Sequence, residues 1–145
     1  MLVRFKKINP NASIPTYGSS YAAGCDLSAC IDQAISIPPH TTIKVPTGLA
    51  IELPENTVGL IYARSGMATK RHLAPANKVG VIDADYRGEI IVALHNHSEE
   101  AQTIEVGERI AQLVVAPFYH VEFEEVDELS ETVRGKGGFG STGTK

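Results

Sequence analysis

The chain has 145 residues, of which 43% are hydrophobic and 21% charged, a composition typical of one folded domain with its own hydrophobic core. Its 13 basic and 17 acidic residues give a net charge of −4, which excludes a broad cationic surface for nucleic acid. No apolar run approaches the ~18 residues of a membrane-spanning helix, and the first residues lack the pattern of a secretory signal. We therefore expect a cytoplasmic protein that binds neither nucleic acid nor membrane.

Short runs of apolar and β-branched residues alternate with turn residues along most of the chain. This pattern, without long amphipathic segments, predicts an all-β protein, a jelly-roll-like barrel or sandwich. Prolines fall between the runs, where they do not interrupt a hydrogen-bonded ladder. The expected strands are residues 3–8, 34–37, 41–45, 48–53, 58–63, 80–82, 89–95, 103–106, 109–116 and 120–126.

Cysteine and histidine are too sparse here to indicate a zinc site. Cys25 and Cys30 lack a second Cys or His pair at the spacing of a zinc finger, and we expect both to be reduced thiols. His95 and His97 share one face of an expected strand, so they could present two metal ligands. With no third ligand in view, we favour a solvated or packed strand face.

The segment after Arg64 predicts the one short helix. Residues 65–71 begin with Ser65, a residue type that commonly caps a helix start. The start of a helix carries unpaired N–H donors and a partial positive charge, and an adjacent arginine would strengthen its hold on a phosphate. This segment is therefore a candidate anion site.

The centre of the chain, from Gly80 to Gly88, carries two carboxylates and a tyrosine at the end of an expected strand. If Asp83 continues the strand, its side chain shares a face with Val81 and lies in a sheltered place, where it can accept a proton from water. The alternative is that Asp83 or Asp85 is a turn residue hydrogen-bonded to its own backbone. The segment by itself favours neither interpretation.

The C-terminal end is first acidic and then rich in glycine. Six carboxylates lie in residues 122–131, and five of the 13 glycines lie in the last eleven residues. A segment of this composition cannot bury enough surface to order itself, which predicts a flexible tail. Because the glycines alternate with cations, hydroxyls and a phenylalanine, the tail could also close over a nucleotide. We expect a folded domain of residues 1–130 and a flexible lid of residues 131–145.

Five segments, in their order and spacing, resemble the five motifs of the deoxyuridine triphosphate diphosphatases, the dUTPases. They are residues 23–29 (AGCDLSA), 63–68 (ARSGMA), 80–88 (GVIDADYRG), 107–113 (GERIAQL) and 134–143 (RGKGGFGSTG). Together they span nearly the whole chain. The resemblance implies a β jelly-roll homotrimer with dUTP as substrate, in which three subunits contribute to each active site.

The resemblance also implies a reaction and a metal. Asp83 is similar to the aspartate that activates the water attacking the α-phosphorus of dUTP, which yields dUMP and pyrophosphate. This reaction would lower dUTP, prevent uracil incorporation into DNA and supply dUMP for dTMP synthesis. Asp26 is similar to the aspartate that holds Mg²⁺ through water, with the ion bound mainly by the substrate phosphates.

Substrate contacts follow from the same resemblance. Asn77 and the backbone of residues 80–82 would form the uracil pocket, and Tyr86 would pack under the deoxyribose. Residues 64–66 and Gln112 would bind phosphates, while the phenylalanine of the tail would stack on the base. The full set of implied substrate contacts is Arg64, Ser65, Gly66, Asn77, Gly80, Val81, Ile82, Tyr86, Gln112, Arg134, Phe139, Gly140, Ser141 and Thr142.

Two other functions stay open. Deaminases of dCTP share the trimeric scaffold, but the sequence lacks their glutamate in the third motif. It also lacks the combination of His-x-Glu with Cys-x-x-Cys of the zinc deaminases, because it contains no Cys-x-x-Cys. A regulatory nucleotide-binding module without turnover is the second alternative, and the intact Asp83 speaks against it. Hydrolysis of dUTP is thus the favoured function.

Overall fold

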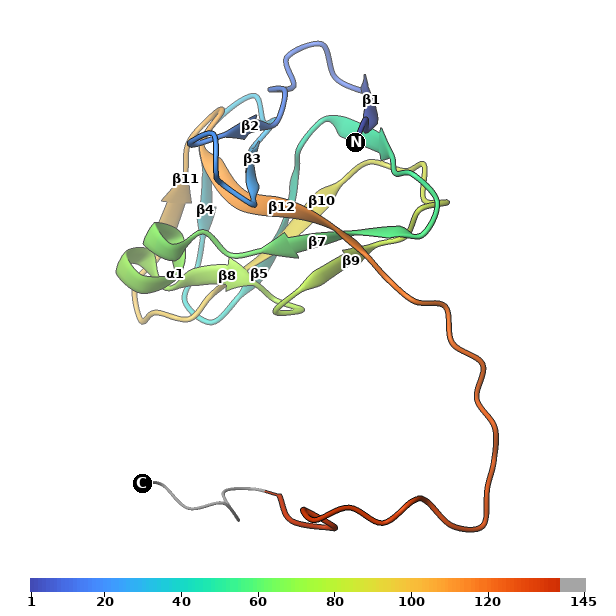
Figure 1. Ribbon diagram of the computed structural model, residues 1–145. Coiled ribbons are helices and arrows are strands. Elements are labelled where there is room, and N and C mark those ends of the chain that lie inside the picture. The colour runs from blue at the N-terminus through green and yellow to red at the C-terminus, as the bar shows by residue number, and fades with distance from the viewer. Residues whose placement is uncertain (139–145) are drawn as a thin grey trace.

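The computed structural model describes residues 1–138 and confirms the predicted all-β class, with twelve strands and one short helix in these residues (Figure 1). The helix α1 spans Ser65–Arg71, as expected. The strands are β1 (Arg4–Lys7), β2 (Thr16–Tyr17), β3 (Cys25–Ser28), β4 (Ile35–Ile37), β5 (Thr42–Pro46), β6 (Leu49–Glu52), β7 (Thr57–Tyr62), β8 (Leu73–Pro75), β9 (Gly80–Ile82), β10 (Ile91–Asn96), β11 (Gln102–Ile104) and β12 (Arg109–Pro117).

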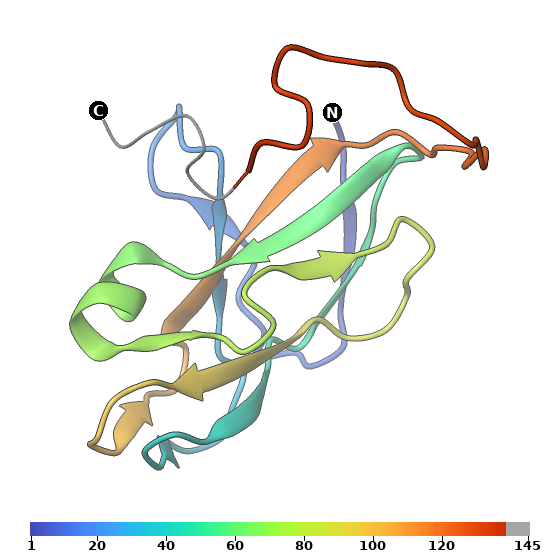
Figure 2. The ribbon, with the colours of Figure 1, turned by 90° about the horizontal axis from the view of Figure 1, so that it is seen from below.

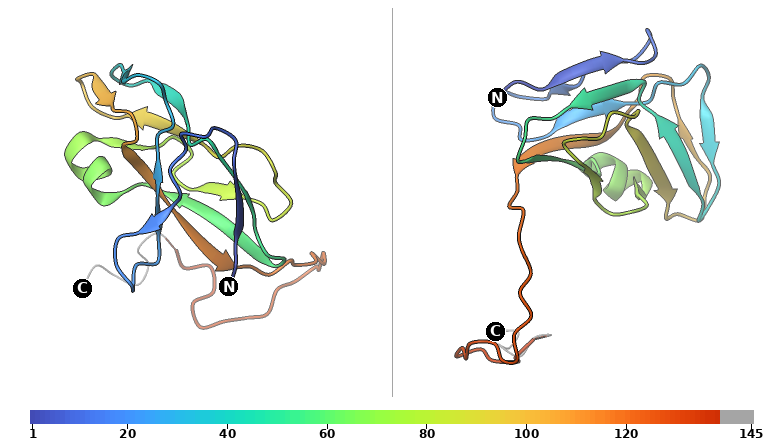
Figure 3. Two further views of the ribbon diagram at one scale, coloured as in Figure 1. Left: turned by 90° about the horizontal axis from the view of Figure 1, so that it is seen from above. Right: turned by 90° about the vertical axis from the view of Figure 1, so that its right-hand side faces the viewer.

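The strands form sheets in which every pairing is antiparallel. The largest sheet has the order β2-β3-β12-β7-β9, and a second has the order β5-β10-β8. β1 pairs with β6, and β11 pairs with β4. Within residues 1–138 the sheets do not join into one closed barrel, so the arrangement is a jelly-roll-like sandwich (Figures 1 and 3).

The core lies between the sheets and is built from alternating strand residues. In β7, buried residues alternate with half-buried ones, which is what a strand with one face on the core requires. β12 lies between β3 and β7 and therefore crosses the middle of the large sheet. The fully buried apolar side chains are Leu27, Ile37, Val45, Leu49, Leu73, Ile90, Leu94, Ile104, Ile110 and Ala111.

The start of β12 departs from this alternation. Ile110 and Ala111 are neighbours in the chain, and both are fully buried. The register of β12 against β3 shifts between Arg109 and Ala111, so that Arg109 lies opposite Ser28 while Ala111 lies opposite Leu27. The extra residue is a β-bulge, which lets both apolar residues face the core and turns Arg109 to the other side of the sheet.

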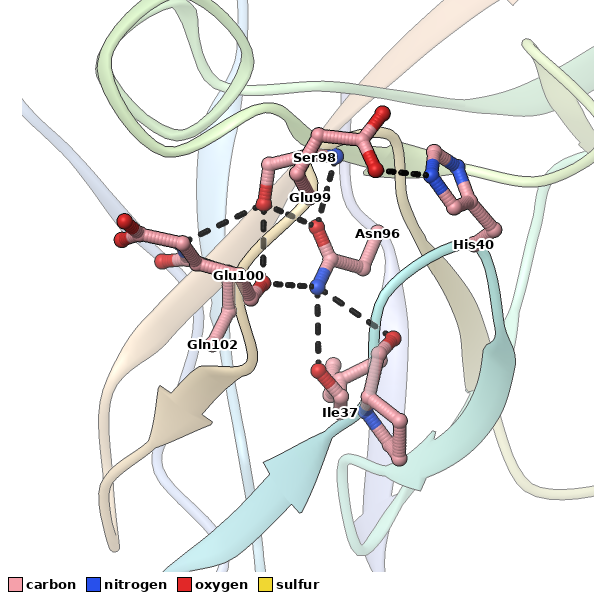
Figure 4. A network of polar contacts seen from close by, with 8 residues as sticks. Ile37, His40, Asn96, Ser98, Glu99, Glu100 and Gln102 are labelled. Carbon is pink, nitrogen blue, oxygen red and sulfur yellow. Dashed lines mark hydrogen bonds and ion pairs between the residues drawn. The ribbon is translucent and has the colours of Figure 1, made fainter.

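Asn96, at the end of β10, joins two loops that are distant in sequence (Figure 4). Its side chain is fully buried, and its oxygen accepts hydrogen bonds from the backbone N–H and the hydroxyl of Ser98. Its amide nitrogen donates to the carbonyl oxygens of Ile37, Pro38 and Glu100 at 3.0, 3.3 and 2.7 Å. The turn after β10 is therefore fixed against the turn after β4.

The prediction of a strand at residues 120–126 is wrong. After β12 the chain runs away from the body of the domain (Figures 1 and 3), and none of these residues forms a strand. The alternating apolar residues Tyr119, Val121 and Phe123 are exposed because the segment pairs with no strand of its own chain among the described residues. In the other direction, the sequence missed the short strands β2, β3 and β8.

Neither cysteine forms a disulfide, which confirms the expected free thiols. Burial raises the pKa of the Cys25 thiol, and desolvation also raises the pKa of Cys30. The rings of His95 and His97 meet edge-on, with centroids 4.4 Å apart. Within the part of the chain that the structure describes, no three His, Cys, Asp or Glu side chains gather to hold a metal ion. None of the described helical structure is long and apolar enough to cross a membrane.

Candidate active site

A first cavity, of about 300 Å³, opens beside β9 at the edge of the large sheet. Because β9 pairs only with β7 among the described strands, one row of its backbone N–H and C=O groups faces outward without a ladder partner. Donors and acceptors at fixed spacing suit recognition of the polar edge of a nucleobase. We call this the base cavity, and its lining residues are Ile61, Asn77, Gly80, Val81, Ile82, Asp83, Tyr86, Glu89 and Ile91.

A tight turn between β8 and β9 brings Asn77 to this cavity. The backbone of Lys78 is left-handed, with φ +66°, and its N–H donates to the carbonyl of Pro75 at 2.9 Å. A Cβ atom at Gly80 would lie 3.5 Å from Nδ2 of Asn77 and only 3.2 Å from Cβ of Ile61. The absence of a side chain at Gly80 therefore relieves a close contact with Ile61 on β7, and the amide of Asn77 lies at contact distance from this position.

Asp83 directly follows β9 and opens the next turn, in which the N–H of Tyr86 donates to the Asp83 carbonyl at 3.1 Å. Its side chain is exposed in the single chain, because β9 is an edge strand, so the sheltered position that one of the two interpretations required is not found. The side-chain hydrogen bonds of this turn come from Arg87, which donates to the carbonyls of Ala84 and Tyr86, and not from Asp83. Asp83 lines the base cavity, and among the described residues no hydrogen bond ties its carboxylate to the turn.

Tyr86 is held by close packing on a glycine. Its hydroxyl donates to the carbonyl of Glu89 at 2.9 Å. A Cβ atom at Gly88 would lie 2.4 Å from the Tyr86 hydroxyl oxygen and 2.5 Å from the ring carbon that bears it. Only glycine leaves room for the ring in this position. Gly88 therefore determines where the Tyr86 ring lies in the wall of the base cavity.

A second cavity, of about 440 Å³, lies where β3, β12 and the start of α1 meet. It gathers residues from the first, second and fourth of the five motif-like segments. Two guanidinium groups oppose one carboxylate, so the cavity carries a net positive charge that suits an anionic ligand. We call it the phosphate cavity, and its lining residues are Gly18, Ala22, Gly24, Asp26, Arg64, Ser65, Gly66, Arg109 and Gln112.

Asp26 is the electrostatic centre of the phosphate cavity. Oδ1 accepts a hydrogen bond from Nε of Arg64 at 2.7 Å, and Oδ2 accepts one from Nη1 of Arg109 at 3.0 Å. Only 14% of the Asp26 side chain is exposed, against 28% for Arg64 and 56% for Arg109. Both oxygens of the residue that the sequence proposed as a metal contact are thus engaged by arginines.

The start of α1 differs in detail from the prediction. Arg64, not Ser65, occupies the N-cap position, with φ −78° and ψ 137°, and no side chain caps the helix. Ser65 is the first helical residue, and its carbonyl accepts a hydrogen bond from the hydroxyl of Thr69 at 2.7 Å. The guanidinium of Arg64 therefore points to Asp26 on β3, and the extended backbone at Arg64 turns the chain from β7 into the helix.

Gln112 reaches the phosphate cavity from the middle of β12. Its Nε2 donates to the carbonyl of Ala63 at 2.9 Å, next to the start of α1. A Cβ atom at Gly24 would lie 2.5 Å from Oε1 of Gln112, so the glycine before β3 makes space for the amide. One side chain thereby links the first, second and fourth segments.

The predicted site residues form two groups in one chain. The base cavity and the phosphate cavity share no lining residue; β9, which lines the first, runs away from α1, whose start lines the second (Figures 1 and 2). Arg134 lies in a turn of the outlying C-terminal segment, where its Nε donates to the carbonyl of Gly137 at 2.9 Å. The predicted contacts in the tail that lie outside the described residues are Phe139, Gly140, Ser141 and Thr142.

The sequence reasoning assigned no role to several residues that line or shape these cavities, among them Arg109, Gly24 and Gly88. All three lie inside the motif-like segments, but nothing local reveals what each one touches. A usable signal existed for Arg109, since the two consecutive apolar residues that follow it break the alternation of the strand. For the two glycines the partner is a side chain far along the chain or a ring packed on the backbone, which spacing alone does not indicate.

A strand edge with outward backbone groups and a separate cation-lined cavity, on a β-sandwich, are features that suit a nucleotide-binding protein. The sequence model of the dUTPase family matches residues 10–143. The deoxyuridine 5'-triphosphate nucleotidohydrolase of Desulfitobacterium hafniense is 54% identical over 131 residues, 90% of this chain and 87% of the relative. That of Acinetobacter baumannii is 44% identical over 148 residues, 99% of each chain.

A solved structure of the Staphylococcus bacteriophage 80alpha dUTPase, a mutant with dUpNHpp, superposes with a TM-score of 0.90, covering 98% of each chain at 29% identity. The match of the family model over most of the chain, together with these relatives, is decisive. The chain belongs to the dUTPase family, whose activity is that of a dUTP diphosphatase.

Proposed function

We propose that the chain hydrolyses dUTP to dUMP and pyrophosphate, with Asp83 as the general base, at sites shared between the subunits of a homotrimer. The observation that carries the proposal is the Asp83 carboxylate, which lines the base cavity and does not serve to hold its own turn. A general base must reach its water molecule, and an exposed carboxylate at a cavity mouth meets that need. Membership of the dUTPase family supports the same reaction.

In the reaction, Asp83 orients a water molecule toward the α-phosphorus and accepts its proton as the new P–O bond forms. The bond between the α-phosphorus and the bridging oxygen to the β-phosphorus breaks, and the electron pair leaves with pyrophosphate. The product that keeps the base is dUMP. The proton then passes from Asp83 to solvent, which restores the base for the next turnover.

Selection of uracil rests on the outward row of backbone groups on β9 and on the Asn77 amide. A backbone carbonyl accepts from N3–H, and donors meet the two carbonyls of uracil, so cytosine would oppose a donor with a donor. Leaving buried polar groups unpaired discriminates strongly, by roughly 10⁴ where a site is built for hydrogen bonds. Steric bulk excludes the methyl group of thymine, and the ring of Tyr86 leaves no space for a 2′-hydroxyl.

The triphosphate is bound by the phosphate cavity, through Arg64, Ser65, Gly66 and Gln112. Among these four residues, Arg64 supplies the positive charge, and the extended backbone at Arg64, just before α1, directs its side chain toward the cavity. The C-terminal segment closes over the nucleotide as a lid. In it, Phe139 stacks on uracil, and the γ-phosphate end is held by Arg134, Gly140, Ser141 and Thr142.

Magnesium fits this arrangement as an ion held mainly by substrate oxygens and water. The described residues offer no cluster of three metal-binding side chains, and Asp26 is the one carboxylate lining the phosphate cavity. Mg²⁺ keeps several waters and favours phosphate oxygens, so it needs no cage of protein ligands. The ion would neutralise phosphate charge, while Asp26 would contact it through a water molecule.

A trimer explains why the base and phosphate groups lie in two separate cavities of one chain. If neighbouring subunits bring a base cavity next to a phosphate cavity, the exposed Asp83 becomes part of a closed site. Exposed apolar residues around the base cavity, among them Val81, Tyr86 and Ile91, suit coverage by a second copy. In a cytoplasmic setting, the enzyme would keep uracil out of DNA and supply dUMP for dTMP synthesis.

The test is pyrophosphate release from dUTP and ammonia release from dCTP by the wild type, D83N and D85N. We expect the wild type to release pyrophosphate from dUTP only, and D83N to lose roughly 10²–10⁴ in kcat, as is typical for removal of a general base. D85N is the matched control, since Asp85 lies two residues further in the same turn. Ammonia from dCTP, or full turnover by D83N, would refute the proposal.

A further inference from the structure

The β-bulge in β12 has a direct effect on the phosphate cavity. In a regular strand, Arg109 would share the face of Ala111 and Leu113, both of which are buried in the core. The register shift instead sets Arg109 opposite Ser28, on the face that also carries Asp26 and Gln112. β-Bulges commonly re-aim a side chain next to an active site, and this bulge delivers a second cation to Asp26.

The contacts of Asp26, Arg64 and Arg109 form a closed ring. The two carboxylate oxygens of Asp26 each accept from one guanidinium, at 2.7 Å from Arg64 and 3.0 Å from Arg109. In addition, Nη1 of Arg64 donates to the backbone carbonyl of Arg109 at 3.3 Å. The guanidinium of Arg64 is thereby fixed by groups of β3 and β12, while its other N–H groups stay available to the cavity.

We propose that Arg109 is a positioning residue that acts through Asp26 to fix the guanidinium of Arg64 toward the triphosphate. The proposal rests on the proposed function, in which Arg64 binds phosphate. Arg109 lies in the fourth motif-like segment, but the resemblance assigned no role to it. Here it holds the second oxygen of Asp26, so the carboxylate cannot rotate away from Arg64.

Charge gives a second reason for the arrangement. A lone Asp26–Arg64 pair would be neutral and would attract phosphate weakly, because the carboxylate would cancel the guanidinium. With Arg109, the three side chains sum to one positive charge, so Arg64 is held by a carboxylate without losing its attraction for an anion. Arginine is better suited to this position than lysine, because a lysine supplies the same charge but not the planar set of N–H donors of a guanidinium group.

The experiment is a double-mutant cycle on the full-length protein, with binding of dUpNHpp measured by calorimetry and turnover of dUTP measured in parallel. R64Q, R109Q and the double variant R64Q/R109Q form the cycle. We expect R109Q alone to weaken dUpNHpp binding about tenfold and to raise KM more than it lowers kcat. In the R64Q background, R109Q should weaken binding clearly less than it does in the wild type, because its positioning effect acts through Arg64 and only the loss of its charge remains.

R109K and R4Q serve as the two comparison variants. R109K keeps the charge and folds with the same strand, so its affinity should fall between those of the wild type and R109Q. R4Q removes an exposed ion pair with Glu52, 3.2 Å long, from the β1–β6 ladder away from the phosphate cavity, and it should leave binding unchanged. Should R109Q fail to fold, R109K in the wild-type and R64Q backgrounds forms the same cycle.

The outcomes separate this proposal from the proposed function. If R109Q weakens dUpNHpp binding equally with and without Arg64, then Arg109 binds the phosphates directly, and the positioning role is overturned. Wild-type affinity in R109Q while R64Q binds weakly would also overturn it, with the phosphate role of Arg64 intact. Wild-type affinity in R64Q itself would overturn both, since Arg64 would then not bind phosphate.

Discussion

In the proposed function, the base cavity and the phosphate cavity recognise one nucleotide by different means. At the base cavity the proposed recognising groups are the outward backbone groups of the edge strand β9, with the Asn77 amide beside them. At the phosphate cavity they are charged and amide side chains on β3, β12 and the start of α1, tied together by ion pairs. Backbone recognition depends on the shape of a strand, whereas side-chain recognition depends on charge and on the packing that aims each group.

The largest loss of activity should come from deleting the C-terminal end of the chain, which lines neither cavity. Deletion of residues 134–145 should leave a folded trimer, because a segment of this polar and glycine-rich composition offers little apolar surface to a core. Turnover of dUTP should fall by orders of magnitude through loss of the lid. Light scattering measures whether the truncated protein is still a trimer, and pyrophosphate release measures its turnover of dUTP. Wild-type turnover in the truncated protein would mean that the two cavities suffice.

A smaller effect is expected where Gly24 packs on Gln112. Gly24→Ala puts a methyl group 2.5 Å from Oε1 of the glutamine, so the amide must leave its contact with the Ala63 carbonyl. Loss of one hydrogen bond, ~1 kcal/mol, should raise KM for dUTP roughly fivefold. Inhibition by deoxyuridine, which has no phosphate, should not change.

The control for this prediction is Gln112→Ala, with and without the change at Gly24. If the new methyl group acts only by displacing the glutamine, Gly24→Ala should add little once that side chain is gone. An equal further loss in the Gln112→Ala background would show that Gly24 acts on something else. A changed affinity for deoxyuridine would show that the two cavities are not independent.

On the base side, Gly88→Ala should loosen sugar selection by a few-fold. The added methyl group would lie 2.4 Å from the Tyr86 hydroxyl oxygen, so the ring must move from the wall of the cavity. The ratio of kcat/KM for dUTP over UTP should fall, because a displaced ring leaves space for a 2′-hydroxyl. Tyr86→Phe, which loses only the bond to the Glu89 carbonyl, should keep that ratio. Unaltered selectivity in Gly88→Ala would remove Tyr86 from sugar recognition.

The smallest effect concerns His97, which lies outside both cavities. Desolvation, together with the nearby charges of His95, Lys78, His40 and His72, lowers the pKa of His97 below its usual 6.5. The folded state therefore binds this proton less readily than the unfolded state, so the contribution to stability is present above pH 6.5 and is lost as the pH falls through the lowered pKa.

Thermal unfolding between pH 7.5 and pH 5 measures this contribution. The melting temperature of His97→Gln should fall less steeply with acid than that of the wild type, and the affinity for dUpNHpp at pH 7.5 should be equal in the two proteins. Parallel curves would contradict the assignment. A pH-dependent difference in affinity without one in stability would link the histidines to a cavity instead.

The sequence predicted the long strands correctly because their signal is local. β7 and β12 contain enough alternating or β-branched residues to be recognised, and Ser65–Arg71 was recognised as a helix between them. β2 has only two residues and therefore no period of its own, while the four residues of β3 do alternate but include only two apolar ones, too few to predict a strand. The segment 120–126 shows the reverse case, in which a period of two exists but no strand within residues 1–138 pairs with it.

The candidate site was predictable as a set of residues and not as a geometry. Motif resemblance identified Asp26, Arg64 and Gln112, which do line one cavity. It did not reveal that Asp26 binds two arginines, because a bulge in β12 decides where Arg109 points. Nor did it reveal that Asp83 is exposed, since burial depends on what covers the edge of β9.

Position 96 should tolerate almost no residue other than asparagine. Its amide nitrogen supplies hydrogen to three carbonyl oxygens while its oxygen serves Ser98, so a replacement must both donate and accept within the same small volume. Aspartate has the same shape but brings a negative charge against carbonyl oxygens, and leucine leaves them buried without any donor. The identity of a single atom, nitrogen instead of oxygen, thus decides whether two loops 59 positions apart in the chain can meet.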